Sequence, residues 1–186
     1  MNSKKLALIA ILAAVSIGTN YAMMPIYNVK FMDLIVFVGG FCFGPLAGAS
    51  IGVISWAVYG TLNPNGFSLV IWLSTMFSES IYGIAGGILR KNLNLNQLDV
   101  SKKDRVNIGL FFGMLGMFLT LLYDIITNAV FGFVSGWNIL FALIMGFVFG
   151  LIHMISNAFF FGLGCRPAIN AIFKAMGGEN PGISKK

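Results

Sequence analysis

Long runs of apolar residues with hardly a charge between them are the feature that most restricts how this chain can fold. Charged residues make up 10% of the 186 residues, hydrophobic residues make up 58%, and the mean hydropathy is +0.87. Soluble domains carry about 25% charged residues, because a surface that faces water needs them. The composition therefore excludes a soluble enzyme, a disordered chain and a disulfide scaffold, and it predicts an integral membrane protein.

The apolar runs predict helices rather than barrel strands. A transmembrane barrel strand alternates apolar and polar residues, whereas the run from Leu34 to Phe43 is apolar at both parities. A helix also satisfies its own backbone hydrogen bonds inside lipid. We predict an all-α membrane protein with one domain over residues 1–186. Its six expected spans are 6–24, 31–44, 46–60, 67–89, 106–134 and 138–163, followed by a short surface helix at 167–176.

The stretch from Phe31 to Gly60 allows two short spans or one long helix kinked at Pro45. Two spans would each cover roughly 21–23 Å, less than the ~30 Å hydrocarbon core. The basic residues favour two, because Lys and Arg hold loops on the cytoplasmic side. With six spans, both termini, the loop at 90–105 and all the Lys and Arg residues except Lys30 lie inside. We therefore predict six spans, cytoplasmic termini and a tight turn at Gly44–Pro45.

The densest polar cluster of the predicted spans is the segment from Tyr123 to Asn128. A charge at bilayer depth costs a few kcal/mol on insertion scales, so an intramembrane carboxylate is a functional candidate. Asp124, Thr127 and Asn128 stand at i, i+3 and i+4, on one face of the fifth span. We interpret this face, together with Tyr123, as part of a ligand site.

Three further ionisable or amide residues leave two interpretations open. His153 and Asn157 stand at i and i+4 on the sixth span, where they can contact a ligand or clamp two helices together. The same alternatives hold for Glu79 in the fourth span. Asp33 is interpreted as one half of an interfacial pair with Lys30.

Aromatic residues gather toward the outer half of the predicted spans. Some of them belong to the belt that lies at the membrane interface, for which Trp137 is the best candidate. We interpret Trp56, Tyr59 and Trp72 as walls of a cavity open to the outside. Such a cavity suits a planar or ring-containing small molecule.

Several other chemistries find little support in the sequence. The chain contains no Gly-Lys dipeptide and so holds no Walker A loop. The net charge of +6 follows from inside loops, so it does not indicate nucleic acid. Cys42 and Cys165 have no CxxC partner, and we predict no metal site and no cofactor.

One enzyme motif needs weighing. Residues 48–52 match G-x-S-x-G around Ser50, and His153 lies on the sixth span, as in an intramembrane serine protease. Ser50 would lie about 7–8 Å from the inner turn and His153 about 15 Å deep, which is too far apart for a nucleophile and its base. This argues against the protease hypothesis.

Taken in order along the chain, these features resemble the substrate-binding S components of energy-coupling factor (ECF) vitamin transporters. Ala7, Ala10 and Ala14 on the first span resemble the family's docking motif for the transmembrane coupling protein. The segments 29–34 and 39–48 look like the second-span region with its Gly-Pro turn. Residues 123–128 look like the fifth-span binding stretch.

The resemblance implies a function and a set of partners. The protein would capture a vitamin or related micronutrient outside a prokaryotic cell, from a multi-pass position in the plasma membrane. It would associate with the coupling protein and two ABC ATPase subunits, and it would topple in the bilayer to release substrate inward. The runner-up hypothesis is a stand-alone ion-coupled carrier or channel that uses Glu79, Asp124 or His153 as a proton relay.

Overall fold

The computed structural model describes residues 3–62, 66–93 and 102–177, and it is all-helical over these residues. The helices in chain order are α1 (Ser3–Met23), α2 (Met32–Phe43), α3 (Pro45–Thr61), α4 (Leu69–Asn92), α5 (Lys102–Val134) and α6 (Ile139–Ala175).

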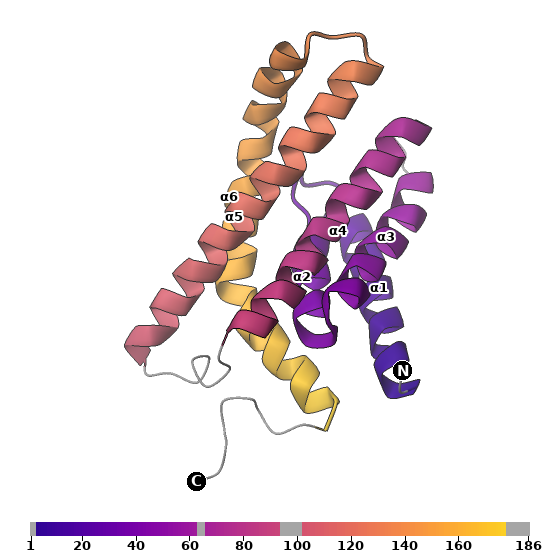
Figure 1. The fold of residues 1–186 in the computed structure, drawn as a ribbon. Helices are drawn as coiled ribbons and strands as arrows, with labels where there is room; N and C mark the ends of the chain where they lie inside the picture. The colour runs from indigo at the N-terminus through magenta and orange to yellow at the C-terminus, as the bar shows by residue number, and fades with distance from the viewer. Residues whose placement is uncertain (1–2, 63–65, 94–101, 178–186) are drawn as a thin grey trace.

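Successive helices run in opposite directions. The start of α1, the end of α4, the start of α5 and the end of α6 all lie at the lower end of the molecule (Figure 1). The long α5–α6 hairpin stands on one side and rises beyond the pair α3 and α4 on the other (Figure 1). Helices α1, α3 and α5 therefore end, and α2, α4 and α6 begin, away from the level at which α1 begins and α6 ends (Figure 1).

Helix α2 occupies the centre of the molecule. It packs against α1, α3, α4 and α6, and all of its residues except Cys42 are buried. A helix that is apolar on nearly all sides either faces lipid or, as here, is buried inside a larger bundle. The short α2 is thus the core around which the longer helices are arranged.

Glycines allow the backbones of α2, α3 and α4 to touch. Gly40, Gly48 and Gly83 meet at one point, and a Cβ added to any of the three would collide with the backbone of another. Close backbone approach through small residues is the main way that helices associate in lipid. Gly40, Gly48 and Gly83 therefore hold α2, α3 and α4 together by direct backbone contact.

The predicted turn at Gly44–Pro45 is also confirmed, and α2 and α3 are two helices rather than one. Gly44 has φ 101°, a conformation that residues with a Cβ rarely adopt. Pro45 is the first residue of α3, where its missing N–H leaves no bond unmade.

The surface helix predicted at 167–176 is not a separate element. Helix α6 continues through Pro167 to Ala175, although this proline cannot donate a hydrogen bond to the preceding turn. Phe161, Cys165 and Ile169 follow one another at i+4 and are all fully buried. Continuous burial of this face offsets the lost bond and carries the helix past the proline.

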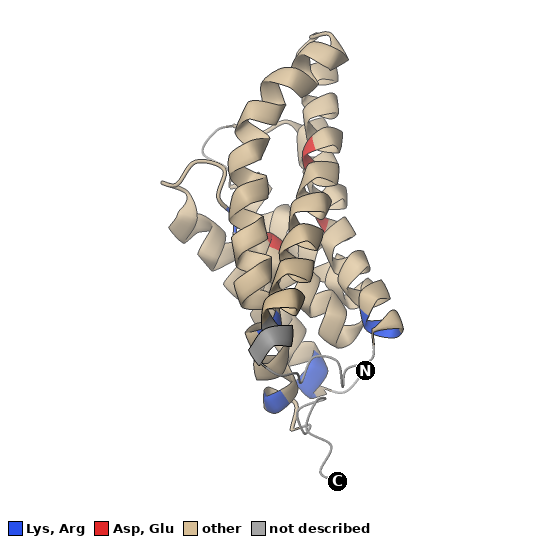
Figure 2. Ribbon diagram, turned by 90° about the vertical axis from the view of Figure 1, so that its left-hand side faces the viewer, with Lys and Arg blue, Asp and Glu red and all other residues tan. Residues whose placement is uncertain are grey.

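Among the described residues, four helices are long and apolar enough to cross a membrane: α1, α4, α5 and α6. Helices α2 and α3 have 12 and 17 residues, which correspond to about 18 and 26 Å. Apart from Lys30, the described Lys and Arg residues lie toward the end where α1 begins and α6 ends, whereas the described Asp and Glu residues lie in the middle of the molecule (Figure 2).

We expect Gly83→Ala to destabilise the protein. The added methyl group would press on the backbone of Gly48, and overpacking of this kind costs about 1–3 kcal/mol. Gly18→Ala on α1 is the matched control, because a Cβ there meets open space and alanine favours the helix. Thermal unfolding in detergent measures both. Equal melting temperatures for the two variants would show that the glycine contact does not hold the helices together.

Candidate ligand cavity and the buried ionic network beneath it

A buried ionic network joins three helices that are far apart in sequence. His153 of α6 lies between two carboxylates, with its Nε2 at 2.6 Å from Oδ2 of Asp33 on α2 and its Nδ1 at 3.1 Å from Oδ1 of Asp124 on α5. Asp33 and His153 are fully buried, and the Asp124 side chain is 13% exposed. A charge in an apolar interior is tolerated when it is paired and hydrogen-bonded, and this arrangement provides both.

Neutral side chains extend the network toward α4. Asn157 donates from Nδ2 to Asp33 at 2.6 Å and contacts the Thr120 hydroxyl at 2.7 Å. The Tyr82 hydroxyl of α4 donates to the same Thr120 oxygen at 3.0 Å. All of these side chains are fully buried. The network therefore ties α2, α4, α5 and α6 together at one level.

Glu79 of α4 forms a second buried polar contact. The Trp56 indole donates from Nε1 to Glu79 Oε2 at 3.0 Å, and Glu79 is fully buried. Gly52 faces Glu79, and a Cβ there would lie 3.2 Å from Glu79 Cγ. The Trp72 indole donates to the Trp56 carbonyl at 3.2 Å. Two hydrogen bonds thus fix Trp56: its indole donates to Glu79, and its carbonyl accepts from Trp72.

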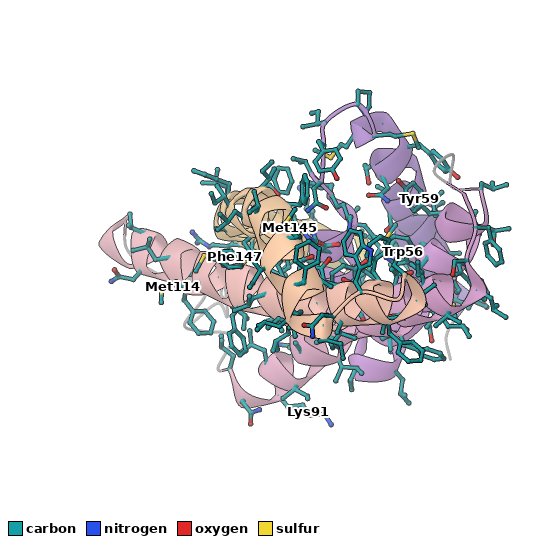
Figure 3. All side chains as sticks on the ribbon, turned by 90° about the horizontal axis from the view of Figure 1, so that it is seen from above. Trp56, Tyr59, Lys91, Met114, Met145 and Phe147 are labelled. Carbon is teal, nitrogen blue, oxygen red and sulfur yellow. The ribbon has the colours of Figure 1, made fainter. Side chains whose placement is uncertain are left out.

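A cavity of about 440 Å³ lies next to this network. It is bounded by the α1–α2 connection, α3, α4, α5 and α6. Seen from above, Trp56 of α3 and Met145 of α6 lie on opposite sides of this region (Figure 3). The polar and aromatic residues that line it are Tyr27, Asn28, Lys30, Trp56, Thr75, Tyr123, Asp124, Thr127, Asn128, Phe131, Trp137 and Phe149.

A smaller hollow of about 250 Å³ adjoins the first. The two share Tyr27, Asn28, Lys30 and Trp56 in their linings. Tyr59 belongs to the smaller hollow, and its ring packs edge-on against Trp56 at 5.3 Å between centroids. The cavity and the adjoining hollow together form a space that is lined by aromatic and polar side chains and could hold a ring.

Lys30 lies between the cavity and the buried acids. Its Nζ is 4.8 Å from the ring centroid of Tyr123 and 5.5 Å from that of Trp56, which are cation–π distances. It is close enough to Asp33, Glu79 and His153 for Coulombic interaction.

Two glycines of α6 make room for the polar side chains of α5. A Cβ on Gly146 would collide with the Asn128 amide, and a Cβ on Gly150 would lie 2.8 Å from Asp124 Oδ2. The spacing of four between these glycines matches the spacing of four between Asp124 and Asn128. Gly146 and Gly150 thus leave space on α6 for the two polar side chains of α5.

The α1–α2 connection is fastened to α6 across the cavity. Asn28 adopts φ 53° and donates from Nδ2 to the Phe149 carbonyl at 2.8 Å. The ring of Tyr27 packs against that of Phe149 with centroids 5.5 Å apart. These contacts place Tyr27, Asn28 and Lys30 in the cavity lining.

A larger hollow of about 540 Å³ lies elsewhere, between the lower halves of α5 and α6. Its lining is apolar and contains no titratable side chain, so it offers no group that would orient a polar ligand. Among the described residues, no group of three or more His, Cys, Asp or Glu side chains is arranged to hold a metal ion.

The residues singled out in the sequence fall into two sets. Tyr123, Asp124, Thr127, Asn128 and Trp56 line the main cavity, and Tyr59 lines the adjoining hollow. The second set lies outside both linings and forms hydrogen bonds to lining residues or to the buried network. It consists of Trp72, Glu79, His153 and Asn157. The Thr127 hydroxyl donates to the Tyr123 carbonyl of its own helix at 3.0 Å.

The serine and histidine of the protease hypothesis do not meet. The exposed Ser50 hydroxyl donates to the Leu46 carbonyl at 2.8 Å, and both ring nitrogens of His153 face carboxylates. The arrangement lacks the nucleophile–base contact that such an enzyme needs.

The chain matches a known protein family over most of its length. Residues 4–163 match the model of the ECF transporter substrate-specific component. The chain belongs to this family. The searches of curated proteins and of solved structures gave no match.

As an S component, the protein is a substrate-binding subunit of a transporter, and the resemblance seen in the sequence is confirmed. This favours the first functional hypothesis over the stand-alone carrier and over the protease.

Sequence reasoning missed the S component's Asp33 and Lys30 as parts of the polar centre. Asp33 is fully buried and bonded to His153, so its interfacial placement is wrong, although Lys30 does lie within Coulombic reach of it. One signal was available for Lys30, because it is the single basic residue that the charge count left on the outer side. Tyr27 and Asn28 carried no comparable signal.

We expect His153→Ala to destabilise the S component strongly. The substitution leaves Asp33 and Asp124 buried without their shared partner, and breaking a buried ion pair in this way costs about 3–5 kcal/mol. Ser156→Ala is the control, because that hydroxyl bonds only to the His153 carbonyl of its own helix. Melting temperatures in detergent compare the two variants. If His153→Ala is as stable as Ser156→Ala, the ionic network does not stabilise the fold.

Proposed function

We propose that this S component captures a small, ring-containing vitamin or related micronutrient in the cavity between Trp56, Tyr123 and Asn128. The observation that carries the proposal is the cavity itself, which combines aromatic walls with a few fixed polar groups, as small-molecule sites do. Family membership supports the same role.

We also propose that the cavity opens to the outside of a prokaryotic plasma membrane. Apart from Lys30, the described Lys and Arg residues lie toward the end where α1 begins and α6 ends, and basic residues mark the cytoplasmic side (Figure 2). The α1–α2 connection and the upper parts of α5 and α6, which line the cavity, lie toward the opposite end (Figure 1). In this orientation all six helices cross or enter the bilayer, with α2 and α3 as short inner helices.

Asp124 and Asn128 are the proposed polar contacts of the substrate. Asp124 lines the cavity while its Oδ1 contacts His153, and its Oδ2 is buried beside Gly150 without a hydrogen-bond partner. Asn128 lies one turn higher on the same wall. The proposed lining also includes Thr127 and Tyr59. Four residues behind the lining position the side chains that contact the substrate and do not contact it themselves: Glu79, Trp72, His153 and Asn157.

Import requires partners that supply energy. We propose a transmembrane coupling protein and two ABC ATPase subunits, because the chain itself contains no Walker A loop. Ala7, Ala10 and Ala14 are exposed on α1, and a Cβ at the nearby Gly18 would meet open space. This small-residue face suits close approach of a partner helix in lipid.

Asp124→Asn and Asn128→Ala should weaken substrate binding about tenfold to a hundredfold, because each removes one direct polar contact worth about 1–3 kcal/mol. Calorimetry in detergent measures this, with the molecule that co-purifies with the protein and is identified by native mass spectrometry. Ile126→Ala is the control on the same helix, since this exposed residue lies outside the cavity lining. Wild-type affinity in both test variants would move the binding site elsewhere.

Ala10→Trp and Ala14→Trp should leave substrate binding intact and abolish uptake, because a bulky side chain keeps a partner helix at a distance. Uptake is measured in cells that also produce the partner subunits, and complex formation by co-purification. Ile155→Trp on the exposed face of α6 is the control for a tryptophan added elsewhere on the surface. If the two α1 variants still co-purify with the partners, the docking face is not on α1.

A further inference from the structure

The apolar hollow between the lower halves of α5 and α6 is a groove on the outside of the bundle. Its lining includes four small residues, Gly109, Gly113, Ala158 and Gly162. A Cβ on Gly113 would lie 2.9 Å from the Ala158 carbonyl oxygen, so the two helices touch along these small residues. The larger lining side chains are 45–76% exposed, and they are Val106, Leu110, Met114, Met117, Phe159 and Leu163. The lower end of α5 also lies at the edge of the molecule (Figure 1).

The groove is as long as one leaflet of a membrane is thick. Its lining on α5 runs from Val106 to Met117, which corresponds to about 16 Å of helix. The hydrocarbon core of a bilayer is ~30 Å thick, so one leaflet supplies ~15 Å. A volume of about 540 Å³ over this length gives a mean cross-section of about 34 Å², whereas a helix about 10–12 Å across has one of about 80–110 Å². An extended hydrocarbon chain therefore fits inside the groove, and a helix would rest on its rims.

Positive charge marks the lower end of the groove. Arg166 follows Gly162 by four residues and Leu163 by three, so it lies on the same face of α6, one turn nearer the lower end. Arg166 is half-buried, and it forms no hydrogen bond or ion pair within the part of the chain that the structure describes. The first four residues of α5, directly before Val106, comprise three bases and one acid in the sequence. An anionic group at this end of the groove would meet an unpaired guanidinium.

We propose that this groove binds one acyl chain of an anionic phospholipid, whose phosphate pairs with the Arg166 guanidinium. The chain covers the apolar lining over the depth of one leaflet, and the phosphate accepts charge-assisted hydrogen bonds at the lower end. Basic sites between membrane helices bind acidic lipid headgroups in this way. The groove shares no lining residue with the substrate cavity, so failure of this inference would leave the proposed function unchanged.

Native mass spectrometry of the detergent-solubilised protein tests the headgroup, with phosphatidylglycerol and phosphatidylcholine of identical acyl chains as probes. We expect one phosphatidylglycerol per protein to be retained at least about fivefold more tightly than phosphatidylcholine, because one basic group near the membrane surface contributes about that factor. Equal retention of the two lipids would overturn the proposal.

A charge variant locates the headgroup. Arg166→Gln should lower the affinity for phosphatidylglycerol about fivefold and leave that for phosphatidylcholine unchanged. Lys91→Gln is the matched control, because Lys91 is exposed near the same end of the protein but belongs to α4 and lies outside the groove. If both variants bind phosphatidylglycerol as the wild type does, Arg166 does not hold the headgroup and the proposal fails.

Two size variants locate the acyl chain. Ala158→Leu fills the groove from within, so we expect it to abolish the retained lipid, whereas Ala22→Leu at an exposed position of α1 should keep it. Leu163→Trp narrows the groove from an exposed position, and it keeps the test decisive if Ala158→Leu fails to fold. Wild-type retention of phosphatidylglycerol in the folded groove variants would overturn the proposal. If these variants instead lose co-purification with the partner subunits, the groove belongs to a partner helix.

Discussion

A histidine held between two buried carboxylates is the interaction on which the rest of this structure depends. Asp33, Asp124 and His153 come from three different helices, and each would be costly in an apolar interior without the others. Together they fix α2 against α5 and α6 at one level, with Asn157 and Thr120 completing the bonds. Asp124 belongs both to this network, through its contact with His153, and to the lining of the cavity. The packing network and the proposed binding site are therefore parts of one arrangement.

Glycine makes that arrangement possible in two ways. At the contact of Gly40, Gly48 and Gly83, the absence of side chains brings three backbones together and buries α2. At Gly146 and Gly150 the same absence leaves space for the side chains of α5 rather than for its backbone. A row of small residues in a membrane helix can thus serve close packing or house a polar group, and the facing residues decide which.

The helices and the lining of the cavity were largely predictable from the sequence, whereas the ionic network was not. Apolar run lengths and the Gly44–Pro45 turn predict α1 to α5 to within a few residues, and the spacing of Asp124, Thr127 and Asn128 predicts their shared face. The continuation of α6 through Pro167 was missed, because burial of its far face depends on helices that the local sequence does not reveal. The partnership of Asp33 with His153 spans 120 residues, so local spacing paired Asp33 with Lys30 instead.

The central claim is that one cavity, bounded by Trp56, Tyr123, Asp124 and Asn128, holds the transported molecule. An experimental structure of the S component purified with its substrate tests this most directly. The account predicts a ring-shaped molecule between Trp56 and Tyr123, within hydrogen-bonding distance of Asp124 or Asn128, with His153 still bonded to both carboxylates. A substrate bound in the apolar hollow between the lower halves of α5 and α6, or a His153 separated from Asp33 and Asp124, would contradict it.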